Sequence, residues 1–508
     1  MRMMLTIIAG LLALPAATAP GGPTAKIDTG IVQGTTAGGL EVFKGIPYAT
    51  PPIGNLRWRA PAAAAPWQGV REATAFGPDC VHDRRDWEAD RNGAPMSEDC
   101  LYLNVWTPAK RLKAGAPVML WIHGGSFTAG SGSQAIYDGA SLAARGVVVV
   151  TINYRLGRFG FFAHPALTAE SPNSPTGNWG LMDMTAALQW VHRNIAAFGG
   201  DPKNVTIFGE SAGGGAVNTL MTMPSVRGLF QRAIAESGGG RDDGVPLTVA
   251  EQKGEAFAKG AGVDGNDLKT LRAIPADKVK GSMTLTNTEA ATYSGPMIDG
   301  RLVTDRIDAV FRAGKQAPVP YLAGGNSYEI GFVPAPLRGA FTAIIGKSLG
   351  DAQPGVLAAY GSQQAYDHSV ASDAVFNEPA RAVAGWNAAN TSYLYQFDYV
   401  PTSKRGTSPG AEHGSEVPFV FGTIDAAGYA VSDEDRKMAT LIGDYWVAFA
   451  KGGNPNGSGR PLWPRYQPSN PSRLVFSSKG AEAASAALPA LDALAKVADA
   501  KRAASPKP

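Results

Sequence analysis

The sequence predicts an α/β protein with a large, mostly parallel central sheet flanked by helices and a small β region near the N-terminus. Residues 147–152 (VVVVTI) form an uninterrupted, mostly β-branched run, which is typical of a strand buried on both faces. Other short apolar runs alternate with segments of helical spacing, and this alternation favours a parallel sheet between two helical layers. Short β-rich pieces separated by Pro/Gly turns at residues 30–58 indicate the N-terminal β region.

The elements that follow appear in a regular order. Residues 118–122 (VMLWI) are a short apolar run that ends at a glycine pair, and residues 181–198 have apolar side chains at helical spacing. Later strands are predicted at 205–208, 233–235, 319–323 and 392–399, and a long amphipathic helix at 434–450. No repeat and no domain-separating linker interrupts this order, so we expect one catalytic domain at 23–480 with lid or regulatory excursions. An Ala-rich C-terminal tail, helical with a frayed end, is expected at 481–508.

The composition is that of a globular protein with a large core. The chain has 508 residues, of which 44% are apolar and 18% charged. Length alone suggests about three domains of roughly 150 residues, but large α/β folds exceed that size. The formal net charge is +3 and there is no dense Lys/Arg patch, so nothing points to nucleic acid or to an anionic membrane surface.

The N-terminus has the pattern of an export signal at residues 1–19. Arg2 precedes an apolar stretch at 5–14 that is short for a bilayer span, and residues 17–19 (ATA) fit a small-x-small cleavage pattern. Pro20 is unfavourable just after that site, so the cut position stays open, and an uncleaved anchor is the alternative. No later segment has the length and apolarity of a membrane span. We therefore expect a periplasmic or secreted protein.

The two cysteines, Cys80 and Cys100, suit an oxidising compartment. An exported protein with one pair favours a single disulfide, which closes a loop of about twenty residues. Such a loop contributes about 3 kcal/mol in the chain-entropy model. Two buried free thiols are the alternative.

The most informative stretch is residues 205–217 (VTIFGESAGGGAV), where a predicted buried strand runs into a glycine-rich turn around Ser211. Residues 209–213 match G-x-S-x-G, the pattern of a nucleophile elbow, in which the serine projects from a sharp strand-to-helix turn. The N-terminal N–H groups of the following helix then point toward developing negative charge. The alternative is a glycine-rich loop with an incidental serine.

A serine nucleophile needs a base, and the order in α/β-hydrolases is Ser, then Asp/Glu, then His. Of the six histidines, His368 and His413 follow the serine. His368 lies in a segment compatible with a helix surface, whereas His413 lies in a polar, glycine-flanked loop after a predicted strand. Loops of that kind carry catalytic groups, so His413 is the preferred base.

The orienting acid is expected between the serine and the histidine, just after a strand. Glu329 meets this condition, because it follows the predicted strand 319–323 and a Gly-Gly-Asn turn. Asp299 and Asp305 are rivals, but the segment 296–301 (PMIDGR) is typical of a turn.

A third requirement is a set of donors for an oxyanion. Residues 124–127 (GGSF) follow the predicted strand 118–122, and backbone N–H groups of such a loop can converge on an oxyanion. We expect His123 to contribute through its backbone and not its imidazole. Metal-ligand spacings such as H-x-x-x-H or C-x-x-C are absent from the sequence, so no metal or other cofactor is expected.

Several distant motifs in the same order resemble the type B carboxylesterase family, the α/β-hydrolases that include cholinesterases and bacterial para-nitrobenzyl-type esterases. The motifs are 43–49 (FKGIPYA), 56–58 (LRW), 97–104 (SEDCLYLN), 198–202 (FGGDP), 208–214 (FGESAGG), and the C-terminal set Trp446, Phe449, Ala450, Gly453, Pro455, Asn456, Trp463 and Pro464. The resemblance covers nearly the whole mature chain and implies the α/β-hydrolase fold.

The resemblance also implies residue roles. Ser211 would be the nucleophile, His413 the general base and then acid, and Glu329 the group that stabilises the imidazolium. The remaining implied roles are a three-donor oxyanion hole from the N–H groups of Gly125, Ser126 and Ala212, a disulfide between Cys80 and Cys100, and a supporting polar network of Glu210, Glu416 and Ser237.

This chain departs from the family pattern at three points. Tyr328 and Ile330 flank the acid where Asp and Gly are frequent, and Ser126 stands where Gly or Ala is usual. The interval from Glu329 to His413 is shorter than usual, which leaves the lining of the gorge and the lid undefined.

The expected activity is hydrolysis of a carboxylic ester through an acyl-enzyme, without a cofactor and with a small-molecule ester as partner. A cholinesterase-type binding module that has lost its catalytic serine is disfavoured, because Ser211, Glu329 and His413 are all present. Amide, lactone or thioester hydrolysis would use the same machinery. The oligomeric state and the size of the substrate stay open, since five aromatic residues suit a pocket and a core equally: Phe127, Phe159, Phe161, Phe162 and Trp179.

Overall fold

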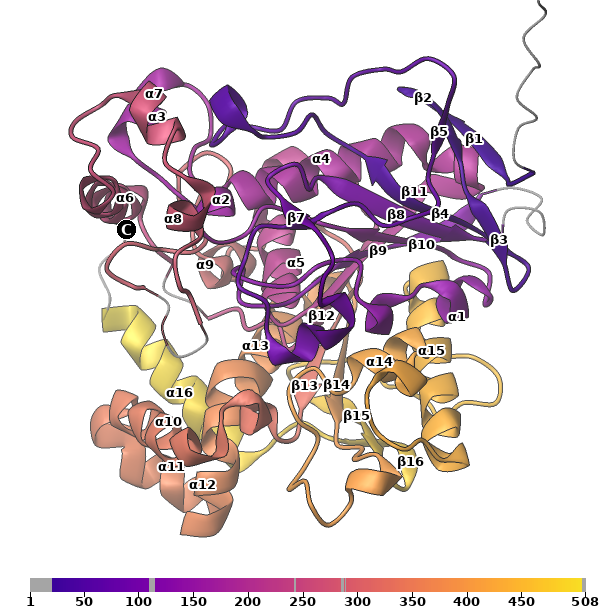
Figure 1. The fold of residues 1–508 in the computed structure, drawn as a ribbon. Helices are drawn as coiled ribbons and strands as arrows, with labels where there is room; N and C mark the ends of the chain where they lie inside the picture. Colours follow the sequence, from indigo (N-terminus) through magenta and orange to yellow (C-terminus); the bar gives the residue numbers. More distant parts are fainter. Residues whose placement is uncertain (1–20, 109–114, 242–243, 285–286, 288, 505–508) are drawn as a thin grey trace, which may run out of the picture.

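A computed structural model describes residues 21–108, 115–241, 244–284, 287 and 289–504; the predicted signal peptide at 1–19 lies outside them. Within this part of the chain, one large sheet has the strand order β16-β15-β14-β13-β12-β11-β9-β10-β8-β4-β3 (Figure 1). Its strands are β3 Thr35–Ala37, β4 Leu40–Pro47, β8 Tyr102–Thr107, β9 Ala116–Ile122, β10 Val148–Ile152, β11 Gly200–Glu210, β12 Arg232–Glu236, β13 Tyr321–Asn326, β14 Ser392–Phe397, β15 Ser472–Ser477 and β16 Gly480–Ser485.

The sheet is parallel in its centre and antiparallel at both edges. All neighbours from β10 to β15 pair in parallel, whereas β8, β4 and β3 on one side and β16 on the other pair antiparallel. The predicted α/β class with a mostly parallel central sheet is confirmed. The N-terminal β region is a separate small sheet of β1 Thr24–Ile27, β2 Gly30–Gln33 and β5 Val70–Glu72, and β6 Asp79–Cys80 pairs with β7 Met96–Ser97.

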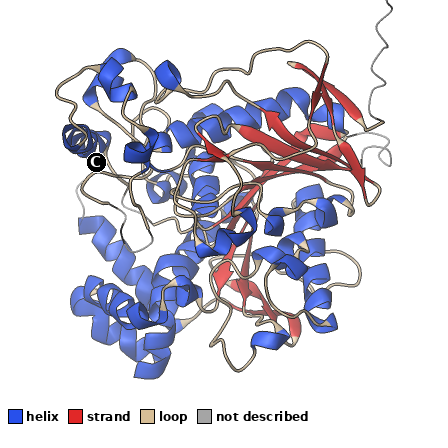
Figure 2. Cartoon of the chain, viewed as in Figure 1, coloured by secondary structure: helices blue, strands red, loops and turns tan. Residues whose placement is uncertain are grey.

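Helices cover both faces of the main sheet (Figure 2). They are α1 Ala140–Ala143, α2 Gly157–Gly160, α3 Pro165–Glu170, α4 Trp179–Asn194, α5 Ala212–Thr222, α6 Leu247–Gly260, α7 Leu268–Arg272, α8 Ala276–Lys280, α9 Ile307–Arg312, α10 Ala335–Ser348, α11 Gln353–Tyr360, α12 Gln363–Ser372, α13 Glu378–Trp386, α14 Val417–Phe421, α15 Asp433–Gly452 and α16 Pro489–Ala504. The predicted helix at 434–450 is confirmed as α15, which begins at a capping box formed by Ser432 and ends at Gly453 in a left-handed conformation.

The uninterrupted apolar strands feed two cores because successive side chains point to opposite faces. In β9, Val118, Leu120 and Ile122 pack in one core with α4 and α5. The alternate residues Met119 and Trp121 pack in the other core with α14 and α15. The central strands are therefore buried on both sides, and their carboxyl ends carry the loops that follow β9, β11, β12 and β13.

A third cluster lies outside the two main cores, among helices that gather at the lower left of Figure 1. It joins side chains from α11, α12 and α16 and the end of α10: Leu349, Val356, Tyr366, Val370, Leu491 and Leu494. The Ala-rich C-terminal segment takes part in the fold up to residue 504, because β16 closes one sheet edge and α16 supplies two of these buried leucines. The helices between β13 and β14 therefore pack against the C-terminal helix α16.

Candidate active site

Ser211 stands at the sharp turn between β11 and α5. Its backbone has φ 55° and ψ −123°, a strained conformation for a residue with a side chain. The neighbouring glycines are required by space: a Cβ at Gly209 would lie 2.6 Å from the Ile122 carbonyl oxygen, and a Cβ at Gly213 would lie 2.0 Å from that atom. The glycines of the G-x-S-x-G motif therefore let the turn pass close to β9.

The loop after β13 and the loop after β14 bring an acid and an imidazole together. Glu329 is fully buried, and its Oε2 lies 2.5 Å from Nδ1 of His413. The other oxygen of Glu329 accepts hydrogen bonds from Ser237 Oγ at 2.6 Å and from the Asn326 backbone N–H at 2.7 Å. These contacts fix the carboxylate and direct Nε2 of the imidazole away from it.

The second ring nitrogen of His413 faces Glu210, the residue before the elbow serine. Nε2 lies 3.1 Å from Glu210 Oε1, and within the described part of the chain no hydrogen bond joins His413 to Ser211. Burial lowers the pKa of His413, but the carboxylates of Glu210 and Glu329 outweigh burial and raise this pKa to about 9. The imidazole is thus held between two acids at the base of the cavity.

Further buried carboxylates surround this pair. Glu416 Oε2 accepts a hydrogen bond from Asn326 Nδ2 at 2.5 Å, and burial together with Glu210 raises the pKa of Glu416 well above its ordinary value. Burial also raises the pKa of Glu210 to about 7 and that of Glu236 to about 8. The structure therefore brings the predicted supporting residues Glu210, Glu416 and Ser237 to one site.

Sequence reasoning missed two members of this cluster. Glu236 pairs in register with Glu210 across β12 and β11, and its Oε1 accepts a hydrogen bond from Trp446 Nε1 at 2.9 Å. Asn326 links the Glu329 and Glu416 carboxylates. The one available signal was their position at strand ends, because the carboxyl ends of parallel strands meet at one edge of the sheet.

The glycine loop after β9 lies beside the serine. A Cβ at Gly124 would lie 3.1 Å from Ser211 Cβ, and Ser126 is exposed with φ 55°. The N–H groups of Gly125 and Ser126 make no hydrogen bond within the described residues. Ala212 is the first residue of α5, where an N–H group has no intrahelical partner. Three unpaired donors therefore flank the serine.

These groups border a cavity of about 400 Å³. Four aromatic side chains form much of its wall: Trp87, Tyr137, Phe332 and Phe376. The ring centroids of Phe332 and Phe376 lie 5.1 and 4.8 Å from that of the His413 ring. Phe332 belongs to the short helical turn Glu329–Phe332, and Phe376 belongs to the π-helical turn Asp373–Asn377. Among the described residues that line the cavity there is no lysine or arginine.

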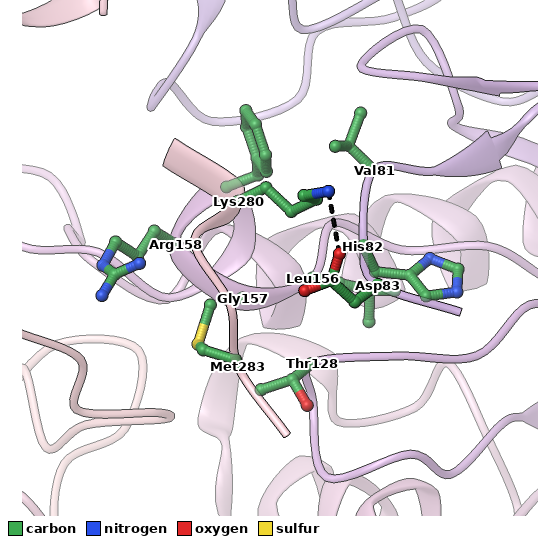
Figure 3. A pocket seen from close by; sticks show the side chains of 10 residues that line it. Val81, His82, Asp83, Thr128, Leu156, Gly157, Arg158, Lys280 and Met283 are labelled. Carbon is green, nitrogen blue, oxygen red and sulfur yellow. Dashed lines mark ion pairs between the residues drawn. The ribbon is translucent and has the colours of Figure 1, made fainter. Parts of the chain in front are cut away.

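A smaller niche lies apart from this cavity (Figure 3). Its volume is about 10 Å³, enough for roughly one water molecule, and Lys280 and Asp83 form an ion pair of 2.8 Å at its edge. It is too small to hold a ligand much larger than a water molecule.

The rival residues lie in other surroundings. His368 is on α12 and packs against Tyr328, with ring centroids 4.9 Å apart. Asp299 closes a turn by accepting backbone hydrogen bonds from residues 301–303, and Asp305 borders a different cavity. Of the five aromatic candidates, four are core residues, Phe159, Phe161, Phe162 and Trp179, whereas the half-buried Phe127 borders that second cavity.

Cys80 and Cys100 are joined by a disulfide, as predicted. The loop that it closes carries Trp87, which is 45% exposed at the wall of the active-site cavity. Among the described residues, no helix combines the length and apolarity needed to cross a bilayer.

The strand order, the strained serine turn after β11 and the acid and histidine loops after β13 and β14 define an α/β-hydrolase. The chain belongs to the carboxylesterase family, whose model matches residues 21–343 and 360–488. It is a carboxylic ester hydrolase.

Two characterised relatives are each 37% identical to the chain. They are the fumonisin B1 esterase of Sphingopyxis macrogoltabida, over 91% of this chain and 88% of that protein, and the para-nitrobenzyl esterase of Bacillus subtilis strain 168, over 89% and 94%. A solved para-nitrobenzyl esterase structure superimposes with a TM-score of 0.82 at 33% identity, covering 93% of this chain and 99% of that one. The carboxylesterase of Geobacillus stearothermophilus gives a TM-score of 0.80 at the same identity and coverage.

Proposed function

We propose that the ester is cleaved through an acyl-enzyme on Ser211, with His413 as the proton-transfer group and Glu329 as its charged partner. The observation that carries the proposal is the 2.5 Å contact between the His413 imidazole and the buried Glu329, beside a strained serine turn. The same arrangement of nucleophile, imidazole and acid serves acyl transfer on unrelated folds.

In the first step the Ser211 hydroxyl adds to the acyl carbon, and its proton passes to Nε2 of His413. The oxyanion is stabilised by the N–H groups of Gly125, Ser126 and Ala212. The intermediate then collapses: the bond to the alcohol oxygen breaks, and this oxygen takes the proton from Nε2. To accept the serine proton, Nε2 turns from Glu210 toward Ser211 when substrate binds, as catalytic hydrogen bonds often tighten only in the complex.

Water completes the cycle. It gives a proton to Nε2 of His413 as its oxygen adds to the acyl carbon, and the second collapse breaks the acyl–Oγ bond and returns the proton to Ser211. The carboxylic acid leaves, and no redox step or cofactor is involved.

The walls of the cavity suggest which esters are preferred. Aromatic side chains line it, and the ionisable side chains among its described lining residues are Glu210, Tyr137 and His413, without a lysine or arginine to bind an anion. We therefore propose neutral, apolar or aromatic esters as the substrate class. Phe127 borders a second cavity of about 340 Å³, which we propose as additional room for a bulky acyl group.

A labelling experiment tests the nucleophile. A fluorophosphonate probe should label the wild-type protein at Ser211 and leave Ser211→Ala unlabelled. Ser126→Ala is the matched control, because it removes another serine that lines the same cavity and should keep the label on Ser211. Peptide mapping that finds the label on any other residue contradicts the assignment.

A substrate pair tests the preferred class. Nitrophenyl butyrate and the nitrophenyl monoester of succinic acid are similar in size but differ by one negative charge. The neutral ester should have a kcat/KM higher by about tenfold or more, a difference of about 1.4 kcal/mol. Equal values for the two esters would rule out the charge argument.

We also propose that the protein acts outside the cytoplasm, with residues 1–19 as the export signal and 23–480 as the catalytic domain. The Cys80–Cys100 disulfide supports export, because such bonds persist in oxidising compartments. Mass spectrometry of the intact protein from the periplasm or the medium should show an N-terminus near residue 20. Recovery of the full-length chain from the cytoplasm alone contradicts this.

A further inference from the structure

The direction of each proposed oxyanion donor depends on the carbonyl of the preceding residue. In a trans peptide the C=O and the next N–H point in opposite directions, so a hydrogen bond that holds the carbonyl also aims the N–H. The N–H groups of Gly125, Ser126 and Ala212 belong to peptides whose carbonyls are on Gly124, Gly125 and Ser211. All three carbonyls accept hydrogen bonds.

Two of these carbonyls are held mainly by backbone donors. The Gly125 carbonyl accepts from the N–H groups of Thr128 and Ala129, at 2.9 and 3.0 Å, and from Thr128 Oγ1 at the longer distance of 3.4 Å. The Ser211 carbonyl accepts from the Gly215 N–H at 2.8 Å, as the first turn of α5 forms. Short backbone hydrogen bonds of the turn and the helix therefore set the direction of these two donors, and the one side-chain contact is long.

The third carbonyl is held by a side chain. Nδ1 of His123 lies 2.8 Å from the Gly124 carbonyl oxygen. The peptide concerned lies between two glycines, and Gly125 has φ 102°, so its flanking dihedrals are the least restricted in the loop. This is the donor that most needs an anchor.

The protonation state of His123 suits the role of a donor. Its side chain is 1% exposed, and burial lowers its pKa to about 4, so the imidazole is neutral at working pH. A carbonyl oxygen only accepts, hence the single proton is on Nδ1. Nε2 has no hydrogen-bond partner within the described residues, so no competing contact favours the other tautomer.

The orientation of the ring is fixed from two sides. The imidazole stacks on the Tyr154 ring at 4.4 Å with an interplanar angle of 18°, and the Tyr154 hydroxyl donates to the His123 carbonyl at 2.8 Å. On the other side a Cβ at Gly130 would lie 2.6 Å from Nδ1, so only glycine leaves room for the ring.

We propose that His123 is a positioning residue for catalysis: its Nδ1–H holds the Gly124 carbonyl and so keeps the Gly125 N–H aimed at the developing oxyanion. The inference rests on the proposed function, since it deepens the role of the same site. It also assigns a role to the imidazole of His123, whereas from the sequence we expected only the backbone of this residue to contribute.

Two substitutions distinguish the contribution of the Nδ1–H donor from that of the stacked ring. His123→Phe keeps a flat ring against Tyr154 but removes the donor, whereas His123→Asn keeps an N–H donor near the position of Nδ1 and removes the stacked ring. The measurements are kcat and KM for nitrophenyl butyrate, the inhibition constant of a trifluoromethyl ketone that forms an oxyanion with Ser211, and Tm.

His123→Phe should lower kcat by about tenfold or more and raise the inhibition constant of the ketone by a similar factor. These effects should be smaller than the roughly 100- to 1000-fold loss of rate that is typical when a whole oxyanion donor is deleted. Its KM should stay within about threefold of wild type, because a donor that acts on the oxyanion contributes little in the ground state. His123→Asn should recover most of kcat and of the affinity for the ketone, because it keeps an N–H donor. It should nevertheless have a lower Tm than His123→Phe, because it loses the stacked ring. A merely structural role would make activity follow Tm instead.

The inference is overturned if His123→Phe keeps kcat and ketone affinity within about twofold of wild type, a change worth about 0.4 kcal/mol. It is also overturned if His123→Asn is impaired as strongly as His123→Phe, because the N–H would then be irrelevant. If one variant does not fold, the other tests the inference by comparing its change in ketone affinity with its change in KM. For His123→Phe the ketone affinity should fall much more than KM changes, and for His123→Asn both should stay close to wild type. Failure of the proposed function looks different: the wild-type protein itself would carry no fluorophosphonate label on Ser211.

Discussion

Replacing Glu210 by glutamine should shift the pH dependence of catalysis, because this carboxylate lies next to the imidazole of His413, the proposed proton-transfer group. Glu210 Oε1 is 3.1 Å from His413 Nε2. Burial lowers the pKa of His413, but the neighbouring carboxylates, Glu210 most of all, raise it to about 9. At this separation the Coulomb energy is about 1.3 kcal/mol with the dielectric constant of water and about 5 kcal/mol with an effective value near 20. Since 1.36 kcal/mol corresponds to one pKa unit, Glu210→Gln should lower the pKa of His413 by at least about one unit.

The assay is the pH profile of kcat/KM, which reports groups of the free enzyme. His413 must be neutral to accept the serine proton, so kcat/KM should rise with pH through about 9 in the wild-type enzyme. Glu210, whose pKa is raised to about 7, is ionised in most of this window. In Glu210→Gln the acidic limb should move to lower pH by at least about one unit. The alkaline plateau should also fall, by up to about tenfold if about 1.3 kcal/mol of imidazolium stabilisation is lost from the transition state.

Glu236→Gln is the matched control for this experiment. Glu236 is a second buried glutamate, in register with Glu210 on the neighbouring strand, and it is not among the charges that raise the pKa of His413. The control should therefore leave the acidic limb in place. A limb that stays within about 0.2 pH units of wild type in a folded Glu210→Gln enzyme would refute the electrostatic reasoning, because even the weakest estimate requires about one unit.

Three further changes test other parts of the structure. Burial raises the pKa of Glu236 from 4.5 to about 8, so the folded state keeps a proton that the unfolded chain loses, and this group lowers stability as pH rises through that window. Thermal melts at pH 5 and pH 8 should therefore show a smaller loss of Tm in Glu236→Gln than in wild type, and equal losses would contradict the raised pKa. Replacing both Cys80 and Cys100 by serine should lower the free energy of unfolding by about 3 kcal/mol, measured by denaturant titration, and an unchanged midpoint would show that the loop adds no constraint. Phe127→Ala should raise kcat/KM for nitrophenyl decanoate relative to butyrate by about threefold or more, since the side chain borders a second cavity of about 340 Å³, and an unchanged ratio would exclude that cavity as acyl space.

The parts of the fold that the sequence predicted are those with a local cause. A run such as 147–152 must be buried on both faces, and it forms β10 in the centre of the sheet. The turn around Ser211 is equally local, because Gly209 and Gly213 are the residues that its close approach to β9 demands. Glu329 and His413, which the structure brings into contact, were predicted because each follows a strand in the chain order expected for an α/β-hydrolase.

The parts that could not be predicted depend on register between distant strands. Glu236 is a partner of Glu210 only because β12 pairs in parallel with β11 at that position, and a shift by one residue would turn its side chain to the other face. Asn326 likewise reaches Glu416 across loops that are 90 residues apart in sequence. Nothing in the composition of either segment specifies these contacts.

The cluster also explains how several buried acids coexist beside one imidazole. Four carboxylates in ionised form would repel one another strongly at low dielectric, so burial and mutual repulsion favour protonation of some of them. Burial raises the pKa of Glu236 to about 8 and the pKa of Glu416 well above its ordinary value, and neither acid contacts His413. Glu210 and Glu329 contact the two ring nitrogens of His413. A raised pKa favours the neutral form of Glu236 and Glu416, so fewer negative charges repel the carboxylates that contact His413. Among the described residues that line the cavity, no lysine or arginine lies beside these carboxylates to offset their charge.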